Sequence, residues 1–317
     1  MSIIQNLYNR LALVSPHIEV RLRQLYWKHH SGLQQYNPNK NSIKAEDPAE
    51  KVDFDDILSQ LKGWGVGEGS LLIVHSSYDN LRCTGLTPME IIDKLLSLVG
   101  EKGTLAMPAI RIYKENPTPD KWLSTDLTAI ECRYNLKRTP VHTGMLPSLM
   151  IRYPQAEISK HPISTLCAIG PLAKEMMAHN IEGDCPSAHG VNSSWKFCLD
   201  HNALICSIGT DLRHHNTMGH VAEEAFGDWY WSDEEWFNIR KFTIEAPREE
   251  PLKIKVKERK PQWGMLHQAE LNRYHDLLKN GVLKTKKIGS VLVEFEESQK
   301  LIDYLQSRNK KGYPYFK

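Results

Sequence analysis

The sequence predicts an α/β fold with a mostly parallel central sheet that helices cover on both faces. Three observations lead to this class. Short apolar runs alternate along the chain with segments whose apolar residues recur at helical spacing. Two of the later runs end at a glycine, Gly170 and Gly209. Strands separated by helices are typical of a parallel sheet that is buried on both faces.

The elements follow in a regular order from residue 53. Phe54, Ile57 and Leu61 lie on one face of a predicted helix, and residues 70–75 form a buried strand. The sequence Thr87-Pro88-Met89-Glu90 combines an N-cap, a proline at the first helical position and a capping-box glutamate, so a helix begins there and runs to about residue 99. Further strands are predicted at 103–107, 165–169, 203–208 and 290–295, and further helices at 267–279 and 301–305.

Polar and apolar residues alternate over residues 241–245 and 252–257. Such alternation is typical of strands with one exposed face. We therefore expect an antiparallel hairpin that extends from one edge of the fold.

Two regions are expected: an N-terminal helical extension and linker over residues 1–50, and one large domain over residues 51–317. In the extension, Ile4, Leu7, Leu11 and Val14 recur at helical spacing, and residues 34–48 have the composition of a linker. This helix binds a membrane surface or a partner, or it packs on the same chain or on a second copy. We favour packing, and a homodimer is one form of it.

The composition is that of a globular protein. Hydrophobic residues make up 41% of the 317 residues, charged residues 25%, and the net charge is +2. The sequence has no dense stripe of Lys and Arg, so nucleic acid is not expected as a partner. Six cysteines without CxxC pairs are typical of a reducing compartment, and neither a signal-peptide pattern nor a run of ~20 apolar residues is present. We expect a cytoplasmic protein that is not integral to a membrane.

The best candidates for a catalytic role lie after the ends of predicted strands. His75, Ser76 and Ser77 follow the buried run 71–74, where open α/β sheets place their ligands. His220 and Glu223 are three residues apart, which puts them on one face of a helix. A histidine with an adjacent carboxylate is a candidate general base.

Other kinds of site are less well supported. His214, His215 and His220 with Glu223 and Glu224 suggest zinc, but the spacing of a tight ligand pair is missing, so we expect no metal. A serine hydrolase normally has the G-x-S-x-G elbow, and residues 74–78 lack both glycines. Dinucleotide, phosphate-loop and HExxH motifs are also missing.

Six segments in the same order resemble the aminoglycoside 3-N-acetyltransferase family, also called the antibiotic N-acetyltransferases. The resemblance covers residues 53–308, although Ser194 stands where drug-resistance members typically have proline. The segments are Leu72–Ser77, Gly100–Pro108, Thr143–Pro147, Ser159–Pro162, Gly190–Ser193, and Gly209 with His220–Glu223.

The resemblance implies transfer of an acetyl group from acetyl-CoA, the co-substrate, directly to an amine of a sugar-like ring. His220 with Glu223 is then the base. His75 is an alternative base or a substrate contact, and Ser77 and His75 are candidate donors to the tetrahedral oxyanion. The residues expected along coenzyme A are Ser76, Ser77, Gly103, Thr104, Ser159, His161 and Ser193.

The acceptor is expected to be an amino sugar, held by Glu224, Asp228 and Trp229. A polycationic aminoglycoside favours an acidic protein, whereas the isoelectric point of this chain is near 8.1. A nucleotide-linked amino sugar used in surface polysaccharide synthesis is therefore the preferred hypothesis, and an aminoglycoside antibiotic is the alternative. From other classes, a metal-dependent hydrolase and an inactive binding protein with the same fold remain open.

Overall fold

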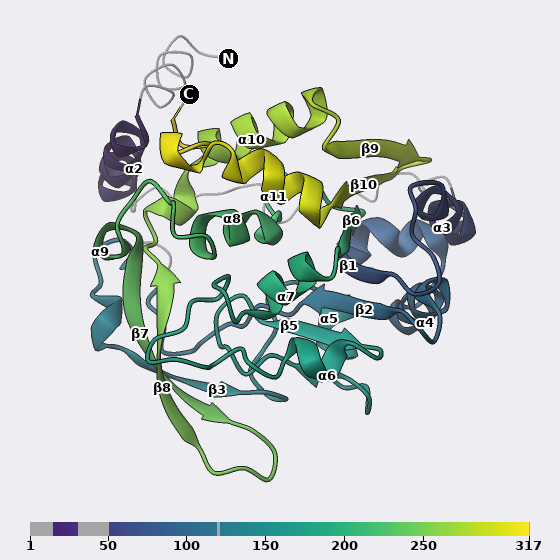
Figure 1. The fold of residues 1–317 in the computed structure, drawn as a ribbon, viewed down its shortest axis with the longest axis horizontal. Helices are drawn as coiled ribbons and strands as arrows, with labels where there is room; N and C mark the ends of the chain where they lie inside the picture. The colour runs from purple at the N-terminus through teal and green to yellow at the C-terminus, as the bar shows by residue number, and fades with distance from the viewer. Residues whose placement is uncertain (1–14, 31–50, 119–120, 317) are drawn as a thin grey trace.

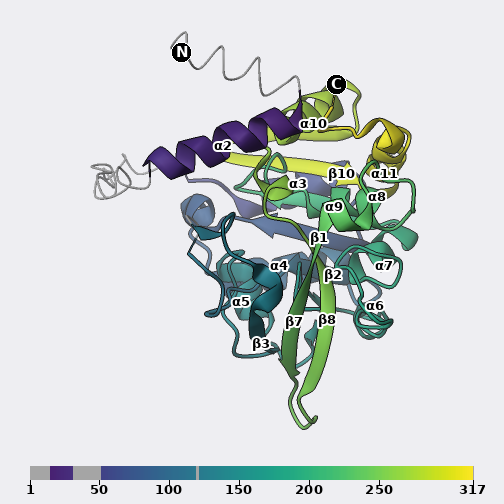
Figure 2. The same ribbon diagram turned by 90° about the vertical axis from the view of Figure 1, so that its left-hand side faces the viewer.

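The computed structural model describes residues 15–30, 51–118 and 121–316. The predicted helical stripe at residues 4–14 and the linker at residues 34–48 lie outside this part of the chain. Helix α2 (Pro16–His30) is described, and the ring of His17 lies 5.5 Å from that of Trp263. Figure 2 shows α2 beside helix α10 (His267–Lys279) near the C-terminus.

A seven-stranded sheet forms the centre of the molecule (Figure 1), in the order β4-β5-β2-β1-β6-β10-β9. Its strands agree with the predicted ones to within about two residues wherever a strand was predicted. The strands are β1 (Leu71–Ser76), β2 (Thr104–Pro108), β4 (Glu157–Ile158), β5 (Leu166–Ile169), β6 (Leu204–Ile208), β9 (Leu283–Ile288) and β10 (Val291–Glu297).

The expectation of a mostly parallel sheet is wrong. Only β1 with β2 and β1 with β6 pair in parallel, and the other four pairings are antiparallel. One cause is local: β9 and β10 are joined by Gly289 and Ser290 alone, and a two-residue connection only joins antiparallel strands. The fold is a mixed α/β fold whose three parallel strands lie at its centre.

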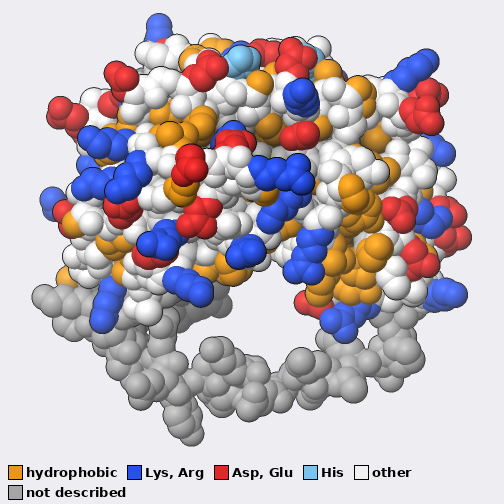
Figure 3. Space-filling model, turned by 90° about the horizontal axis from the view of Figure 1, so that it is seen from below, with side chains coloured by type: hydrophobic (Ala, Val, Ile, Leu, Met, Phe, Trp, Pro, Cys, Tyr) orange, Lys and Arg blue, Asp and Glu red, His pale blue; other side chains and the backbone are white. Residues whose placement is uncertain are grey.

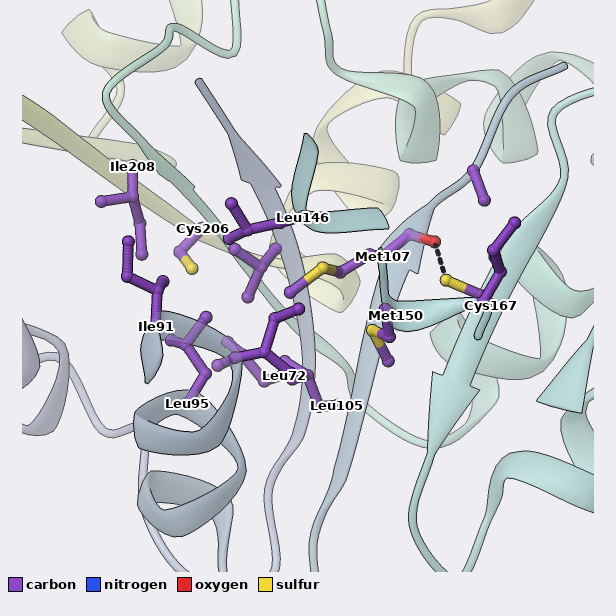
Figure 4. Packing of buried hydrophobic residues seen from close by; sticks show 14 of the residues in the cluster. Leu72, Ile91, Leu95, Leu105, Met107, Leu146, Met150, Cys167, Cys206 and Ile208 are labelled. Carbon is purple, nitrogen blue, oxygen red and sulfur yellow. Dashed lines mark hydrogen bonds between the residues drawn. The ribbon is translucent and has the colours of Figure 1, made fainter. Parts of the chain in front are cut away.

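The two faces of the sheet pack against different helices. Leu72 and Val74 share a cluster with residues of α3 (Phe54–Gly63), α4 (Pro88–Val99) and α5 (Met145–Met150). Figure 4 shows Leu72 and Cys206 facing Ile91 and Leu95 of α4. Leu71 and Ile73 point the other way and pack with α6 (Ala173–Met176), α7 (Ser194–Asp200), α8 (His220–Glu224), α10 and α11 (Ser298–Gln306).

Helix α4 begins as its sequence predicts. Thr87 Oγ1 accepts a hydrogen bond from Glu90 N, and Glu90 Oε2 accepts one from Thr87 N at 2.7 Å. Both bonds satisfy backbone N–H groups that have no partner within the first turn of the helix. Helix α10 has the predicted bounds, whereas α11 begins three residues before the predicted start.

A smaller sheet of three strands carries the predicted hairpin. Strand β7 (Phe237–Glu245) pairs antiparallel with β8 (Leu252–Arg259), which confirms the hairpin, and β3 (Glu131–Asn135) pairs parallel with β7. The hairpin extends away from the central sheet in Figure 1. Strand β8 runs back from the hairpin turn toward α8, which its last residue Arg259 contacts, and helix α9 (Asp233–Trp236) immediately precedes β7.

The surface mixes charges of both signs. On the face seen in Figure 3, Lys and Arg side chains are scattered among acidic side chains and apolar areas. Among the described residues, no helix combines the length and apolar character needed to cross a membrane.

Candidate active site

His220 and Glu223 lie on one face of α8, as their spacing predicts. The helix begins at His220, directly after a 3-10 turn over Thr217–Gly219. His220 Nδ1 is 2.7 Å from Glu223 Oε2, a hydrogen bond between imidazole and carboxylate. Only 4% of the Glu223 side chain and 16% of the His220 side chain are exposed. The pair is therefore largely shielded from water while the imidazole stays accessible.

Two further residues complete this group, and both come from distant parts of the chain. Arg259 Nη1, at the end of β8, lies 3.0 Å from His220 Nδ1 and 3.7 Å from Glu223 Oε2. The hydroxyl of Tyr315 donates to Glu223 Oε1 at 3.2 Å. No local pattern in the sequence marks either residue, because 39 residues separate Arg259 from His220 and 92 separate Tyr315 from Glu223.

The imidazole of His220 is unprotonated at neutral pH. Burial, followed by the positive charge of Arg259, lowers the pKa of His220 to about 4, although Glu223 acts in the opposite direction. Burial alone would raise the pKa of Glu223, but the hydrogen bond from His220 and the positive charge of Arg259 lower this pKa and keep the carboxyl group ionised. The stable state is thus a neutral imidazole hydrogen bonded to a carboxylate.

A second histidine and carboxylate lie beside the first pair. His189 Nδ1 is 3.1 Å from Glu224 Oε1. This distance is short enough for an ion pair, but the two groups are not oriented for a hydrogen bond. The backbone N–H of His189 donates to Glu224 Oε2 at 3.2 Å. The rings of His189 and His220 are 5.1 Å apart. The sequence reasoning missed His189, although it directly precedes the segment Gly190–Ser193.

A cavity of about 460 Å³, here called the base cavity, opens onto His220. His189 and Glu224 line it as well, and so does the loop 162–164. Its charged lining is mainly basic, since the acidic members are Glu224 and Glu258 and the basic ones are Arg111, Lys257, Arg259 and Lys260.

A second cavity of about 450 Å³, here called the serine cavity, lies at the carboxyl ends of β1 and β2. His75, Ser76 and Ser77 line it together with His142 and His215. Burial lowers the pKa of His75 to about 3, with a smaller contribution from His215, so this imidazole is also neutral. Its Nε2 atom is buried and has no hydrogen-bond partner among the described residues.

His75 and His220 therefore do not line one shared cavity, contrary to the expectation of a single site. They are nevertheless close in the fold. Ile110 lines both cavities, and the consecutive residues His214 and His215 line one each. His75 lies on the same face of β1 as Leu71 and Ile73, because every second side chain of a strand points to the same side. This is the face of the sheet that α8 covers. The two cavities adjoin across these residues.

Gly103 and Thr104 line neither cavity, and their assignment to coenzyme A stays a prediction. Gly103 directly precedes β2 and Thr104 begins it, at the end of the strand opposite to the serine cavity. A Cβ atom on Gly103 would lie 2.3 Å from the carbonyl oxygen of Val99, so this glycine permits close packing of α4 against the sheet. Thr104 Oγ1 is buried and accepts a hydrogen bond from Leu172 N.

Ser159, His161 and Ser193 are also occupied by structural contacts, and none of them lines either cavity. Ser159 Oγ accepts from the backbone N–H of His161, and the His161 ring contacts the carbonyl oxygens of residues 163 and 186. Ser193 caps α7 by accepting from Lys196 N. Ser159 and His161 thus hold the segment that leads into the loop 162–164, which lines the base cavity.

The structure brings together two of the three residues expected to hold the acceptor. Glu224 lines the base cavity, and together with Trp229 it lines a third cavity of about 330 Å³. Trp229 also packs with Trp231, Trp236 and Tyr315. Asp228 lines none of the three cavities and accepts a hydrogen bond from Asn309 Nδ2 at 2.9 Å.

The histidines considered for zinc do not share one site. His214 and His220 both line the base cavity but pair with different carboxylates, Glu270 at 2.9 Å and Glu223 at 2.7 Å, whereas His215 lines the serine cavity. Over the described part of the chain, no three His, Cys, Asp or Glu residues form a group that could hold a metal ion.

Comparison with known proteins places the chain among acetyltransferases. The model of the aminoglycoside 3-N-acetyltransferase family matches residues 73–309. Aminoglycoside N(3)-acetyltransferase IX of Micromonospora chalcea is 28% identical over 178 residues, which are 54% of this chain and 61% of that protein. The chain spans about half to three fifths of the length of the curated relatives that it matches.

Solved structures share the fold. Aminoglycoside acetyltransferase AAC(3)-Xa superposes with a TM-score of 0.66 at 19% identity, covering 82% of this chain and 93% of that one. AAC-IIIb in a binary complex with CoASH gives a TM-score of 0.63 at 16% identity, covering 82% and 97%. At such identities the likeness shows the fold alone. The family model, which covers most of the chain, shows that this protein belongs to the aminoglycoside 3-N-acetyltransferase family.

Proposed function

We propose that the protein is an acetyl-CoA-dependent N-acetyltransferase that transfers the acetyl group directly to an amine of an amino sugar. One observation carries the proposal. A neutral imidazole, His220, is hydrogen bonded at 2.7 Å to the carboxylate of Glu223 and opens onto a cavity large enough for a sugar ring. Membership of the family supports the same reaction.

The reaction needs a base because sugar amines are largely protonated at neutral pH. With its Nδ1 proton directed at Glu223, the imidazole keeps a lone pair on Nε2. This lone pair removes a proton from the amine, whose nitrogen then attacks the thioester carbonyl. The C–N bond forms, the C–S bond breaks, the proton held by His220 passes to the departing sulfur, and the second proton of the former ammonium group leaves the nitrogen to water. A positioned base contributes about 100- to 10,000-fold in rate.

The serine cavity is proposed to hold the acyl end of acetyl-CoA. The hydroxyl groups of Ser76 and Ser77 line it and can hydrogen bond to amide groups of the pantetheine arm. The unpartnered Nε2 of His75 and the hydroxyl of Ser77 are the candidate contacts for the thioester oxygen. Donor and acceptor then approach each other from adjoining cavities.

The acceptor best supported by the comparisons is an aminoglycoside. The curated relatives carry aminoglycoside acetyltransferase names, such as aminoglycoside N(3)-acetyltransferase IV of Salmonella sp. This changes the preference drawn from the sequence, in which the nucleotide-linked amino sugar came first and the aminoglycoside was the alternative.

One observation keeps an anionic amino sugar as the second candidate. Four basic side chains and two acidic ones line the base cavity. Part of this charge is compensated, since Lys257 pairs with Asp233 and Arg259 lies beside Glu223. A polycation nevertheless gains less in such a cavity than an acceptor that carries a phosphate or carboxylate group.

A thiol-release assay with acetyl-CoA tests the proposal. The acceptor panel contains aminoglycosides, neutral amino sugars and nucleotide-linked amino sugars, and the acetylated position is read by NMR. We expect release of free CoA with at least one class. Turnover of aminoglycosides alone would support the first candidate, and turnover of nucleotide-linked sugars alone the second. No thiol release with any amine, at enzyme concentrations that detect one turnover, contradicts the proposal.

The proposed place of action is the cytoplasm. All six cysteines are free thiols, and burial raises the pKa of Cys167, Cys198 and Cys206, which makes these thiols unreactive. Unpaired cysteines are the rule in reducing compartments.

A further inference from the structure

The small sheet contributes a charged group to the proposed base. Arg259 is the last residue of β8, and its guanidinium reaches α8. Its Nη1 atom lies 3.0 Å from His220 Nδ1, 3.7 Å from Glu223 Oε2 and 3.5 Å from the hydroxyl of Tyr315. Its carbon Cζ also lies 6.0 Å from the ring centre of Trp236, on which the cation rests. One side chain thus touches every member of the group around His220.

The geometry at Nδ1 limits what Arg259 can do there. A neutral imidazole has one proton, and the carboxylate of Glu223 at 2.7 Å is the stronger acceptor for it. Once Nδ1 carries the proton, it has no lone pair to accept a hydrogen bond from Arg259. Arg259 therefore acts on His220 as a nearby positive charge, and two like charges at this distance in a partly buried site oppose each other.

Resting on the proposed role of His220 as the base, we propose that Arg259 is a positioning residue: its guanidinium, fixed between Tyr315 and Glu223, adds to burial in disfavouring the protonated imidazole of His220 and keeps the ring directed at Glu223. A base that is already unprotonated can accept the proton of the acceptor amine at once. The small sheet, which carries Arg259, is then part of the catalytic apparatus and not only a structural extension.

The other charged groups near His220 do not replace Arg259. Glu223 favours the protonated imidazole, and His189 opposes it less strongly than Arg259 does. Glu224 is occupied by His189. Tyr315 is half-buried, and the loss of solvent around its hydroxyl raises its pKa, so the hydroxyl stays neutral. The remaining groups that line the base cavity have contacts of their own: Arg111 with the carbonyl oxygens of Thr139 and Leu136, Lys257 with Asp233, Glu258 with Arg240, Lys260 with the carbonyl oxygen of Glu234, and His214 with Glu270.

The test compares Arg259→Gln with Arg259→Lys and with Lys255→Gln. Lys255 is exposed on the same strand and lines none of the three cavities, so it is the matched control. Two properties are measured in parallel: the titration of the His220 ring by NMR, assigned with His220→Gln, and the pH profile of kcat/KM. Thermal unfolding shows whether each variant is folded.

Arg259→Gln is expected to raise the pKa of His220 from about 4 by at least one unit, which is about a tenfold change in its protonation equilibrium. The acid limb of kcat/KM moves to higher pH by the same amount. Arg259→Lys keeps the charge and is expected to restore most of the wild-type profile, and Lys255→Gln to leave it unchanged.

Two outcomes overturn the proposal. One is an unchanged His220 titration in folded Arg259→Gln. The other is a higher KM at every pH with an unmoved acid limb, which identifies Arg259 as an acceptor contact alone. If the wild-type protein acetylates no amine, the proposed function fails, but the NMR titration still reports whether Arg259 sets the protonation state of His220.

Discussion

At the scale of single residues, burial controls which groups near the site carry charge. Glu296 of β10 is fully buried, and this burial raises its pKa to about 8 even though Arg273 acts in the opposite direction. Arg273 also lowers the pKa of Glu223 and lies against Gly219, directly before α8. Glu296 is thus a neutral acid beneath the site at neutral pH.

Glu296 predicts a dependence of stability on pH. Between about pH 4.5 and 8 the folded protein keeps a proton on Glu296 that the unfolded chain releases, so this residue costs stability as the pH rises through that window. Glu296→Gln removes the ionisable group at similar volume. We expect its melting temperature to rise relative to wild type between pH 5 and pH 8, whereas exposed Glu250→Gln shows no such trend. A constant offset for Glu296→Gln at all pH values would contradict the assignment.

The site could be predicted from the sequence only where its residues are neighbours in the chain. His220 and Glu223 are three residues apart, and helical geometry then brings them together. His75, Ser76 and Ser77 were found because they follow a buried strand. Arg259 and Tyr315 were missed because only the tertiary fold brings them to α8.

At the scale of elements, the packing of α4 on the sheet depends on Gly103. A Cβ atom there would lie 2.3 Å from Val99 O and 2.9 Å from Ser70 O, both backbone atoms. Gly103→Ala is therefore expected to destabilise the protein by about 1–3 kcal/mol or more, as overpacking does. Gly67→Ala, where nothing lies within 4 Å, is the control.

Denaturant unfolding of both variants, with CoA binding measured alongside, separates packing from ligand binding. If Gly103→Ala is as stable as wild type but loses CoA affinity, the original assignment of Gly103 to coenzyme A is right and the packing account is wrong.

Elements were predicted well where a local signal marks them. The capping box fixed the start of α4, and buried runs marked β1, β2, β5, β6 and β10. Strand β9 was missed because its sequence, Leu-Lys-Thr-Lys-Lys-Ile, exposes three central residues and is an edge strand protected by lysines. Strand β3 was missed although polar and apolar residues alternate along it as they do over residues 241–245, because its partner β7 is distant in the chain and no neighbouring strand marks it.

At the scale of the whole molecule, strand direction and the division of the site were beyond the sequence. The spacing of hydrophobic residues along the chain shows which residues are buried but not which way a strand runs. The antiparallel pairings of β5 and β10 were therefore not predicted. The same limit explains why His75 and His220 were expected in one cavity and lie in two adjoining ones. The division at residue 50 and the homodimer remain predictions.

The central claim, that His220 is the base of an acyl transfer between two adjoining cavities, is tested most directly by one measurement. It compares kcat/KM for thiol release, with CoA affinity determined in parallel, in wild type, His220→Ala and His179→Gln. His179 forms an exposed histidine–glutamate pair with Glu182 and is the matched control. The account predicts that His220→Ala loses about 100- to 10,000-fold in kcat/KM with unchanged CoA affinity, and that the control keeps its rate. A His220→Ala enzyme that keeps most of its rate would contradict it.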